Sequence, residues 1–203
     1  MNSKELIIKT TISLISENKD DIDKITMREI SKEAGVGLGL INYHFENKDK
    51  LIEVCVEKIV NSIIEKFHTF GEITKDCTPF EKLNYLGNLT FTFLFENEAI
   101  SKISMLSDMK CAKETDNTHR TIEAYIPLIK ECRPDWNFEK VQQASFNLIS
   151  AMQLAFLRHE IIFKIQGINL KDQNQRKKFH TKILKSILEI NDKKGDFNEN
   201  NSY

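Results

Sequence analysis

Residues 25–51 read ITMREISKEAGVGLGLINYHFENKDKL, and this stretch carries the clearest structural signals of the sequence. A Thr-x-x-Glu capping box at Thr26 predicts the start of a short helix, because its side chains can satisfy the first backbone N–H groups. Gly35 predicts the end of that helix, since glycine readily adopts the left-handed backbone found at helix C-termini. A second short helix is expected at residues 38–45. Two short helices joined by so tight a glycine-containing turn form a helix-turn-helix.

The second of these helices has an inner and an outer side. Ile41 and Phe45 are four residues apart and would face the core. The positions left on or near the outer side, which can enter a major groove of DNA, are Leu38, Gly39, Leu40, Asn42, Tyr43 and His44. Asparagine can pair with adenine, leucine can pack on thymine methyl groups, and glycine permits close approach of the backbone. The alternative is that the two leucines pack against neighbouring helices.

Helical periodicity continues through the rest of the chain, without a strand pattern or an internal repeat. A capping pattern at residues 2–5 predicts a first helix that ends in the polar residues 18–21, and Asn47 can cap a longer helix ending before Gly71. Further helices are expected over residues 80–95, 98–109, 118–133, 138–165 and 172–190. The sequence therefore predicts an all-α fold.

These elements divide into two domains and a tail. Residues 1–50 are expected to form an N-terminal three-helix helix-turn-helix DNA-binding domain, and a linking helix over residues 47–70 joins it to the remainder. Residues 51–191 are expected to form a larger helical domain. Residues 192–203 are rich in Asn and Asp and are expected to be disordered, because they can bury little apolar surface.

Charge and the N-terminal sequence set limits on the class of protein. The chain has 29 Lys and Arg against 30 Asp and Glu, and residues 1–50 carry 8 against 9. DNA binding would therefore rest on a few placed cations rather than on a basic excess. There is no signal-peptide pattern and no stretch of 18 uncharged apolar residues, so we expect a cytoplasmic protein without a membrane partner.

The sequence offers no recognisable catalytic or metal-binding constellation. The four cysteines lie more than twenty positions apart, too scattered for zinc knuckles or redox motifs. The stretch that begins at His159 starts like a zinc-protease helix, but Phe163 stands where the second histidine ligand is required. No Gly-rich phosphate loop is present either. We therefore expect no enzyme activity, no metal and no cofactor.

Residues 25–51 closely resemble the DNA-binding segment of TetR-family regulators. The resemblance rests on Thr26, Ile30, Ala34-Gly35-Val36, Tyr43-His44-Phe45, Lys48 and Leu51. It implies a ligand-responsive transcription regulator, more often a repressor, that binds a near-palindromic double-stranded DNA operator as a homodimer. By resemblance, Arg28, Tyr43, His44 and Lys48 are expected to contact DNA, and Thr26 joins this set.

Three positions depart from the usual TetR-family pattern. Gly37 replaces a frequent Ser or Thr cap, Leu40 replaces a frequent Ser or Thr, and Asn42 replaces a frequent Tyr. The fold does not depend on these positions, but the operator sequence cannot be inferred from a relative.

The resemblance also implies a pocket for an unidentified small-molecule effector in the larger domain. Met and aromatic side chains crowd the middle of the chain, and such side chains adapt to varied ligands. The residues assigned to this pocket are Phe91, Phe95, Met105, Met109, Tyr125, Met152 and Phe156. For each of them the alternative is an ordinary core position.

A stripe with small residues follows one side of the helix expected at residues 138–165. It consists of Ala144, Leu148, Ala151 and Ala155, and it would let another helix approach closely. The partner helix is either internal or from a second subunit. Because the family generally dimerises through its last two helices, the stripe is assigned to a homodimer interface together with Phe179, Ile183, Leu184, Ile187 and Leu188.

A different class of function stays open beside this one. Short helical hairpins with glycine turns also occur in proteins that never bind DNA, so the chain could be a helical small-molecule or partner-binding protein. Specific binding to an operator separates the two functions.

Overall fold

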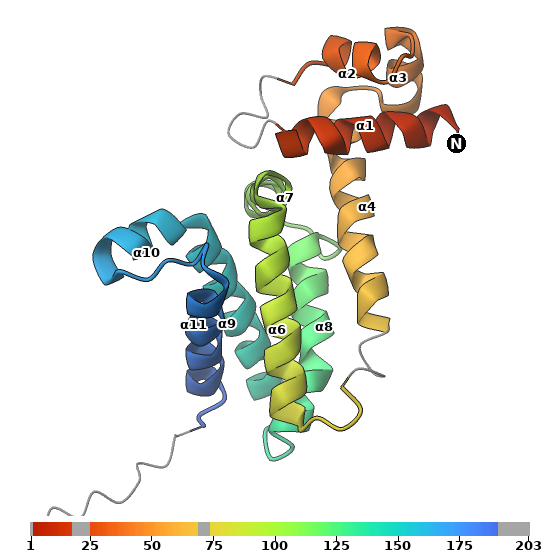
Figure 1. Cartoon of the computed structure of the whole chain (residues 1–203). Helices are drawn as coiled ribbons and strands as arrows, with labels where there is room; N and C mark the ends of the chain where they lie inside the picture. Colours follow the sequence, from red (N-terminus) through yellow and green to blue (C-terminus); the bar gives the residue numbers. More distant parts are fainter. Residues whose placement is uncertain (1, 18–24, 69–73, 191–203) are drawn as a thin grey trace, which may run out of the picture.

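The computed structural model describes residues 2–17, 25–68 and 74–190, and within them the chain forms ten α-helices and no strand (Figure 1). The all-α prediction is confirmed. The helices are α1 (Ser3–Glu17), α2 (Met27–Glu33), α3 (Leu38–Phe45), α4 (Lys48–His68), α6 (Pro79–Glu96), α7 (Glu98–Lys110), α8 (Asn117–Cys132), α9 (Phe138–Leu157), α10 (His159–Gln166) and α11 (Gln173–Ile187). The expected end of the first helix at residues 18–21 and the tail at residues 192–203 lie outside the described residues.

Local capping signals start and stop the N-terminal helices as the sequence predicts. In each case a side-chain oxygen accepts a hydrogen bond from the backbone N–H three residues on, at 2.8 Å for Asn2, 3.2 Å for Thr26 and 2.9 Å for Asn47. These bonds satisfy N–H groups that have no partner within the helix. Gly35 has a φ of 63°, the left-handed conformation that ends α2.

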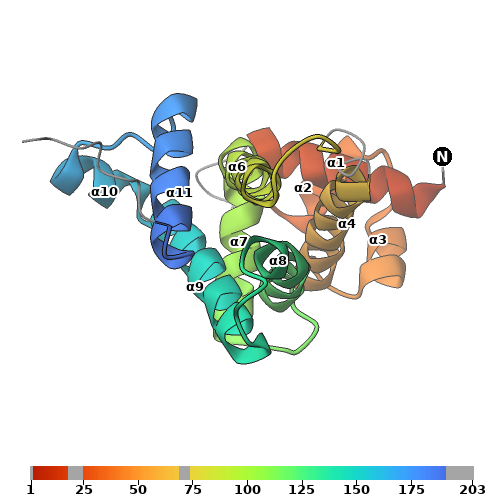
Figure 2. The same ribbon diagram turned by 90° about the horizontal axis from the view of Figure 1, so that it is seen from below.

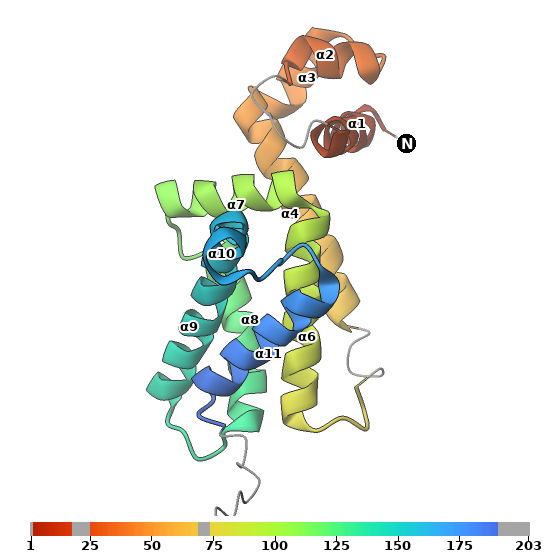
Figure 3. The same ribbon diagram turned by 60° about the vertical axis from the view of Figure 1, so that its left-hand side comes forward.

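The first three helices pack with the start of α4 around a small core (Figure 1). Fully buried side chains come from all four helices: Ile7, Ile15, Ile30, Ile41 and Leu51. The same cluster includes Ala99 and Ile100 from α7, which lies across the top of the larger domain beneath α1 (Figure 3). The small domain therefore rests directly on α7.

The larger domain is a helical bundle around a second core. α9 packs along α8, and α11 packs against both α6 and α9 (Figure 2). The largest fully buried side chains of this core are Leu83, Phe91, Tyr125, Ile129, Leu148 and Phe156. α10 lies on the side of the bundle away from α4 (Figure 2). Among the described helices, none combines the length and apolar character needed to cross a bilayer.

The prediction of a single helix over residues 138–165 is wrong, because the segment forms two helices. α9 ends at Leu157 and α10 begins at His159. The backbone of Arg158 between them has φ −113° and ψ 19°. His159 Nδ1 lies 2.8 Å from the carbonyl oxygen of Phe156, and a side chain that inserts into the hydrogen-bond ladder interrupts a helix.

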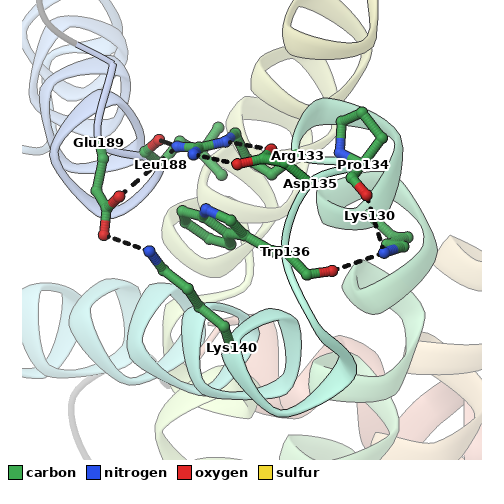
Figure 4. A network of polar contacts seen from close by, with 8 residues as sticks. All are labelled: Lys130, Arg133, Pro134, Asp135, Trp136, Lys140, Leu188 and Glu189. Carbon is green, nitrogen blue, oxygen red and sulfur yellow. Dashed lines mark hydrogen bonds and ion pairs between the residues drawn. The ribbon is translucent and has the colours of Figure 1, made fainter.

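Charged and aromatic contacts fasten the loop between α8 and α9 to the end of α11 (Figure 4). Trp136 lies between two cations, because the guanidinium carbon of Arg133 is 4.3 Å and Nζ of Lys140 4.2 Å from the ring centroid. Arg133 Nη1 donates to the carbonyl oxygen of Leu188 at 2.6 Å, and Lys140 Nζ lies 2.8 Å from Glu189 Oε1. Because Trp136 is only 5% exposed, its indole fills the space beneath this network.

Candidate functional site

α3 has one buried side and one exposed side. Ile41 is 0% exposed and Phe45 is 3% exposed, so these two side chains fix the helix on the small-domain core. On the other side, Leu38 is 36%, Leu40 38% and Tyr43 81% exposed. Most of each leucine is covered by the protein and part of it stays accessible, so packing on neighbouring helices and contact with DNA both stay predictions. Their accessible surface is available to a partner.

Gly39 and Asn42 complete the exposed side of α3. Nothing lies within 4 Å of the place where a Cβ of Gly39 would be, so the backbone there is open to close approach. Gly37 precedes the helix without a side-chain cap, which follows from its departure from the usual Ser or Thr. The exposed side thus combines apolar, aromatic and amide groups.

His44 lies toward α1. Its Nε2 is 3.3 Å from Ser3 Oγ, and its half-buried ring meets the Tyr43 ring edge-on with centroids 5.2 Å apart. These contacts make His44 a residue that positions α3 on α1. Its contact with DNA stays a prediction.

The other predicted contact residues surround α3 on neighbouring elements. Thr26 Oγ1 is engaged in the cap of α2, Arg28 is exposed on that helix, and Lys48 begins α4. Sequence reasoning missed Lys4, whose Nζ lies 5.9 Å from the centroid of the Phe45 ring and so beside α3. Only the packing of α1 on α3 brings this cation here, so no local signal could have identified it.

A pocket of about 470 Å³ lies in the larger domain between α4, α6, α7, α8 and α9. Its lining is predominantly apolar. Of the residues assigned to an effector pocket, Met105, Tyr125 and Met152 line it. The volume is within the range of about 300–1,000 Å³ that is common for small-molecule sites.

The other four residues assigned to the pocket lie elsewhere, which corrects that part of the assignment. Phe95 packs edge-to-face on Phe156 with centroids 5.1 Å apart, and Phe91 lies 5.6 Å from Phe95. These three rings form an aromatic cluster of the core, in the tilted and edge-to-face arrangements that aromatic pairs prefer. Met109 is 60% exposed near the end of α7.

Polar side chains that the sequence did not single out form two hydrogen-bonded groups on the pocket wall. Asp108 Oδ2 accepts hydrogen bonds from the backbone N–H and the hydroxyl of Thr118, at 2.9 and 2.8 Å. Gln153 Nε2 donates to Thr118 Oγ1 at 3.0 Å, and Asn117 Nδ2 donates to Ser104 Oγ at 3.1 Å. Burial raises the pKa of the Asp108 carboxyl, and the Thr118 hydrogen bonds partly oppose that shift.

Residue spacing on α7 could have revealed this wall. Ser101, Ser104, Met105 and Asp108 share one face of the helix, since they are three or four residues apart. Ser101 is 3% exposed, and its hydroxyl has no hydrogen-bond partner among the described residues. Polar groups on the inner face of a packed helix indicate a cavity.

The model of bacterial regulatory proteins of the tetR family matches residues 7–55, which hold α2, α3, most of α1 and the start of α4. Residues 7–55 of this chain therefore match the DNA-binding domain of the tetR family. The family model covers the DNA-binding helices, so the helix-turn-helix read from the sequence is confirmed.

Two related proteins extend the likeness beyond the matched segment. An HTH-type transcriptional regulator from Haemophilus influenzae is 27% identical over 190 residues, which cover 91% of each chain. A candidate type I restriction enzyme endonuclease subunit from Methanocaldococcus jannaschii is 28% identical over 182 residues, but these cover 89% of this chain and 15% of that protein.

Solved structures share the fold. A TetR-like transcriptional regulator from Rhodococcus sp. RHA1 has a TM-score of 0.61 at 12% identity and covers 90% of this chain and 93% of its own. A candidate fatty acid metabolism regulator from Clostridium perfringens has a TM-score of 0.58 at 21% identity and covers 93% and 100%. At such identities the likeness shows the fold alone.

The small-residue stripe on α9 faces the chain's own core. Ala144, Leu148 and Ala155 are 4%, 0% and 5% exposed, and Ala151 is partly buried. Side chains buried within one chain have no surface left for a second copy. The assignment of this stripe to a dimer interface is therefore corrected to the internal packing that the sequence left as the alternative.

The residues assigned to the interface on and just after α11 divide in the same way. Leu184 and Leu188 are 0% exposed and belong to the core. Phe179, Ile183 and Ile187 are partly buried against that core and keep some accessible surface. Only these last three can still contact a second copy.

Proposed function

We propose that this regulator represses transcription by binding a near-palindromic DNA operator as a homodimer, and that a small-molecule effector in the larger domain weakens the binding. The observation that carries the proposal is the exposed side of α3, with Leu38, Leu40 and Tyr43 outward while Ile41 and Phe45 hold the helix on the core. A helix fixed in this way can enter a major groove without repacking its domain. Two such helices of a dimer would read half-sites about 34–36 Å apart.

Base reading in this proposal falls to apolar and amide groups. Leu38 and Leu40 pack on thymine methyl groups, and Asn42 pairs with an adenine edge, so each half-site has an A·T-rich core. Arg28 and Lys48 contact phosphates. Few cations take part, so few phosphates are neutralised. The slope of log affinity against log salt concentration, about −0.9 for each phosphate neutralised, should therefore be shallow.

Replacing Asn42 by alanine should weaken specific DNA binding by about 1–3 kcal/mol and relax the preference at one base pair. The operator is first selected from a random DNA pool with the wild-type protein, and affinities are then measured by fluorescence anisotropy. Gln166→Ala removes an exposed amide from the end of α10, far from α3 and outside the proposed dimer surface, and should leave affinity unchanged. Equal affinities of the wild type and Asn42→Ala for every selected site would contradict the assigned contact.

The same selection tests the leucines and the competing function. Leu40→Ser should lose one thymine preference, and an identical consensus would show that Leu40 does not read bases. If the wild type enriches no sequence at all, the chain is better explained as a helical binding protein, and the regulator proposal fails.

The homodimer is proposed to form over the exposed sides of α9 and α11. Phe146 and Leu154 on α9 are 53% and 57% exposed, and Ile183 and Ile187 on α11 are partly exposed. The two helices pack against each other, so these side chains can contribute to one apolar surface. An exposed apolar surface of this kind favours association.

Leu154→Glu should raise the dimer dissociation constant by at least about tenfold, because it would bury a charge in an apolar interface. Sedimentation equilibrium of the 23.6 kDa chain measures the effect. Leu106→Glu on α7 is the matched control, since Leu106 is 55% exposed and lies on another helix. A wild-type chain that sediments as a monomer at micromolar concentration would refute the dimer.

Effector response is supported by two residues that belong to both domains. Val56 on α4 and Ile100 on α7 line the pocket and also pack in the small-domain core. A ligand that moves either side chain therefore alters the packing beneath α1–α3. To change operator occupancy, it must bind one arrangement of the dimer more tightly than the other.

A further inference from the structure

The charged residues of the pocket carry information about the ligand. Three of the described residues that line it are charged: Asp108, Arg120 and Glu123. Arg120 Nη2 donates to Asn61 Oδ1 on α4 at 3.1 Å in an exposed position, and Glu123 is exposed. Glu123 is therefore screened by water, whereas Arg120 and Asp108 are both half-buried. The Arg120 guanidinium already has a partner in Asn61, so the Asp108 carboxyl, which pairs with no described cation, is the charged group that a ligand can engage.

Asp108 keeps an acceptor atom unused. Both hydrogen bonds from Thr118 end on Oδ2, and Oδ1 accepts none from the described residues. No described cation forms an ion pair with this carboxyl. A partly buried carboxylate gains most from a charged donor that replaces lost water.

Ser101 provides a second, independent polar group. Its buried hydroxyl has no partner among the described residues, although buried hydroxyls are nearly always hydrogen-bonded. It lies on the same face of α7 as Asp108, seven residues earlier, which is about 10.5 Å along the helix axis. Met105, Tyr125 and Met152 add apolar surface to the same pocket.

We propose that the effector is an amphipathic amine. Its protonated nitrogen donates to Asp108 Oδ1, its apolar body packs on Met105, Tyr125 and Met152, and a second polar atom about 10 Å away bonds to Ser101. The proposal rests on the ligand-responsive function above. A free carboxylate ligand is disfavoured, because Asp108 would repel it, even though one solved neighbour is named for fatty acid metabolism.

Three probes share the same apolar chain and differ in the head group, so their affinities show which head group the pocket prefers. They are octylamine, octan-1-ol and octanoate. Isothermal titration calorimetry of the full chain at pH 7 should give octylamine about tenfold or more tighter binding than octan-1-ol, with octanoate weakest. Asp108→Asn should reduce the affinity for octylamine to that for octan-1-ol. Glu123→Gln removes the same charge from an exposed lining position and should change the affinity for octylamine by less than about threefold.

A second comparison tests Ser101. In the wild type, 8-aminooctan-1-ol should bind more tightly than octylamine, and Ser101→Ala should abolish that difference. Thermal melting by circular dichroism checks that each variant is folded. Tightest binding by octanoate, or an unchanged preference for octylamine in Asp108→Asn, would overturn the proposal. Equal binding of the two amines by the wild type would overturn the role of Ser101.

Operator binding is measured separately, so the two proposals fail in different ways. Octylamine should release operator DNA from the wild type and not from Asp108→Asn. A protein that binds its operator but none of the probes refutes the amine and leaves DNA binding standing. A protein that binds octylamine through Asp108 but no operator refutes the regulator function.

Discussion

Trp136→Ala should lower the free energy of unfolding by about 3–5 kcal/mol, the usual cost of removing a large buried aromatic side chain. Trp136 is 5% exposed and packs in the core of the larger domain. Its loss also removes the surface on which the cations of Arg133 and Lys140 lie, so the end of α11 loses its attachment to the α8–α9 loop (Figure 4). The variant therefore loses both core volume and a tertiary contact.

Urea unfolding followed by far-UV circular dichroism measures this loss. Fluorescence is unsuitable, because Trp136 is the single tryptophan of the chain. Trp136→Phe keeps most of the ring and removes an N–H that has no hydrogen-bond partner among the described residues, so it should cost less than about half as much. A loss below about 1 kcal/mol in Trp136→Ala would show that the loop repacks and that the indole is not central to the core.

Acidification from pH 6.5 to 4 should destabilise the protein by about 3 kcal/mol through His180 alone. His180 is 0% exposed between α6 and α11, and burial lowers its pKa to about 4. Nδ1 donates to Asn84 Oδ1 at 3.1 Å, and Nε2 has no partner among the described residues. A Cβ added at Gly87 would overlap this imidazole, so the ring is closely confined.

The sign follows from where each state takes up its proton. Below about pH 6.5 the unfolded chain protonates this histidine, whereas the folded chain stays neutral there until about pH 4. Stability from the neutral ring is therefore fully present above pH 6.5 and is lost as the pH falls. Chemical unfolding at several pH values measures the free energy of unfolding. Its slope against pH should be shallower in His180→Gln than in the wild type.

His119→Gln is the matched control for that experiment, because His119 is exposed on α8. Its slope between pH 6.5 and 4 should follow the wild type. If His180→Gln and the wild type lose stability in parallel, carboxylates alone account for the acid sensitivity, and the buried imidazole does not contribute.

Features that depend on neighbouring residues could be predicted from the sequence alone. The capping box at Thr26, the left-handed Gly35 and the i, i+4 pair Ile41 and Phe45 define the helix-turn-helix, because each acts within one or two helical turns. The exposed side of α3 follows from the same spacing, so the sequence predicts the candidate DNA-binding surface without any tertiary contact.

Tertiary structure decided what depends on segments far apart in the chain. Met105 lines the pocket while Phe95 joins an aromatic cluster, although both are apolar residues on packed helices. The stripe through Leu148 is internal because α8 and the rest of the bundle cover it, and composition cannot distinguish that cover from a second copy. Asp108 is part of a pocket only because Thr118 and Gln153 approach from other helices. Hydrophobic burial is non-directional, so periodicity gives the inner side of a helix, whereas long-range packing selects which neighbour meets it.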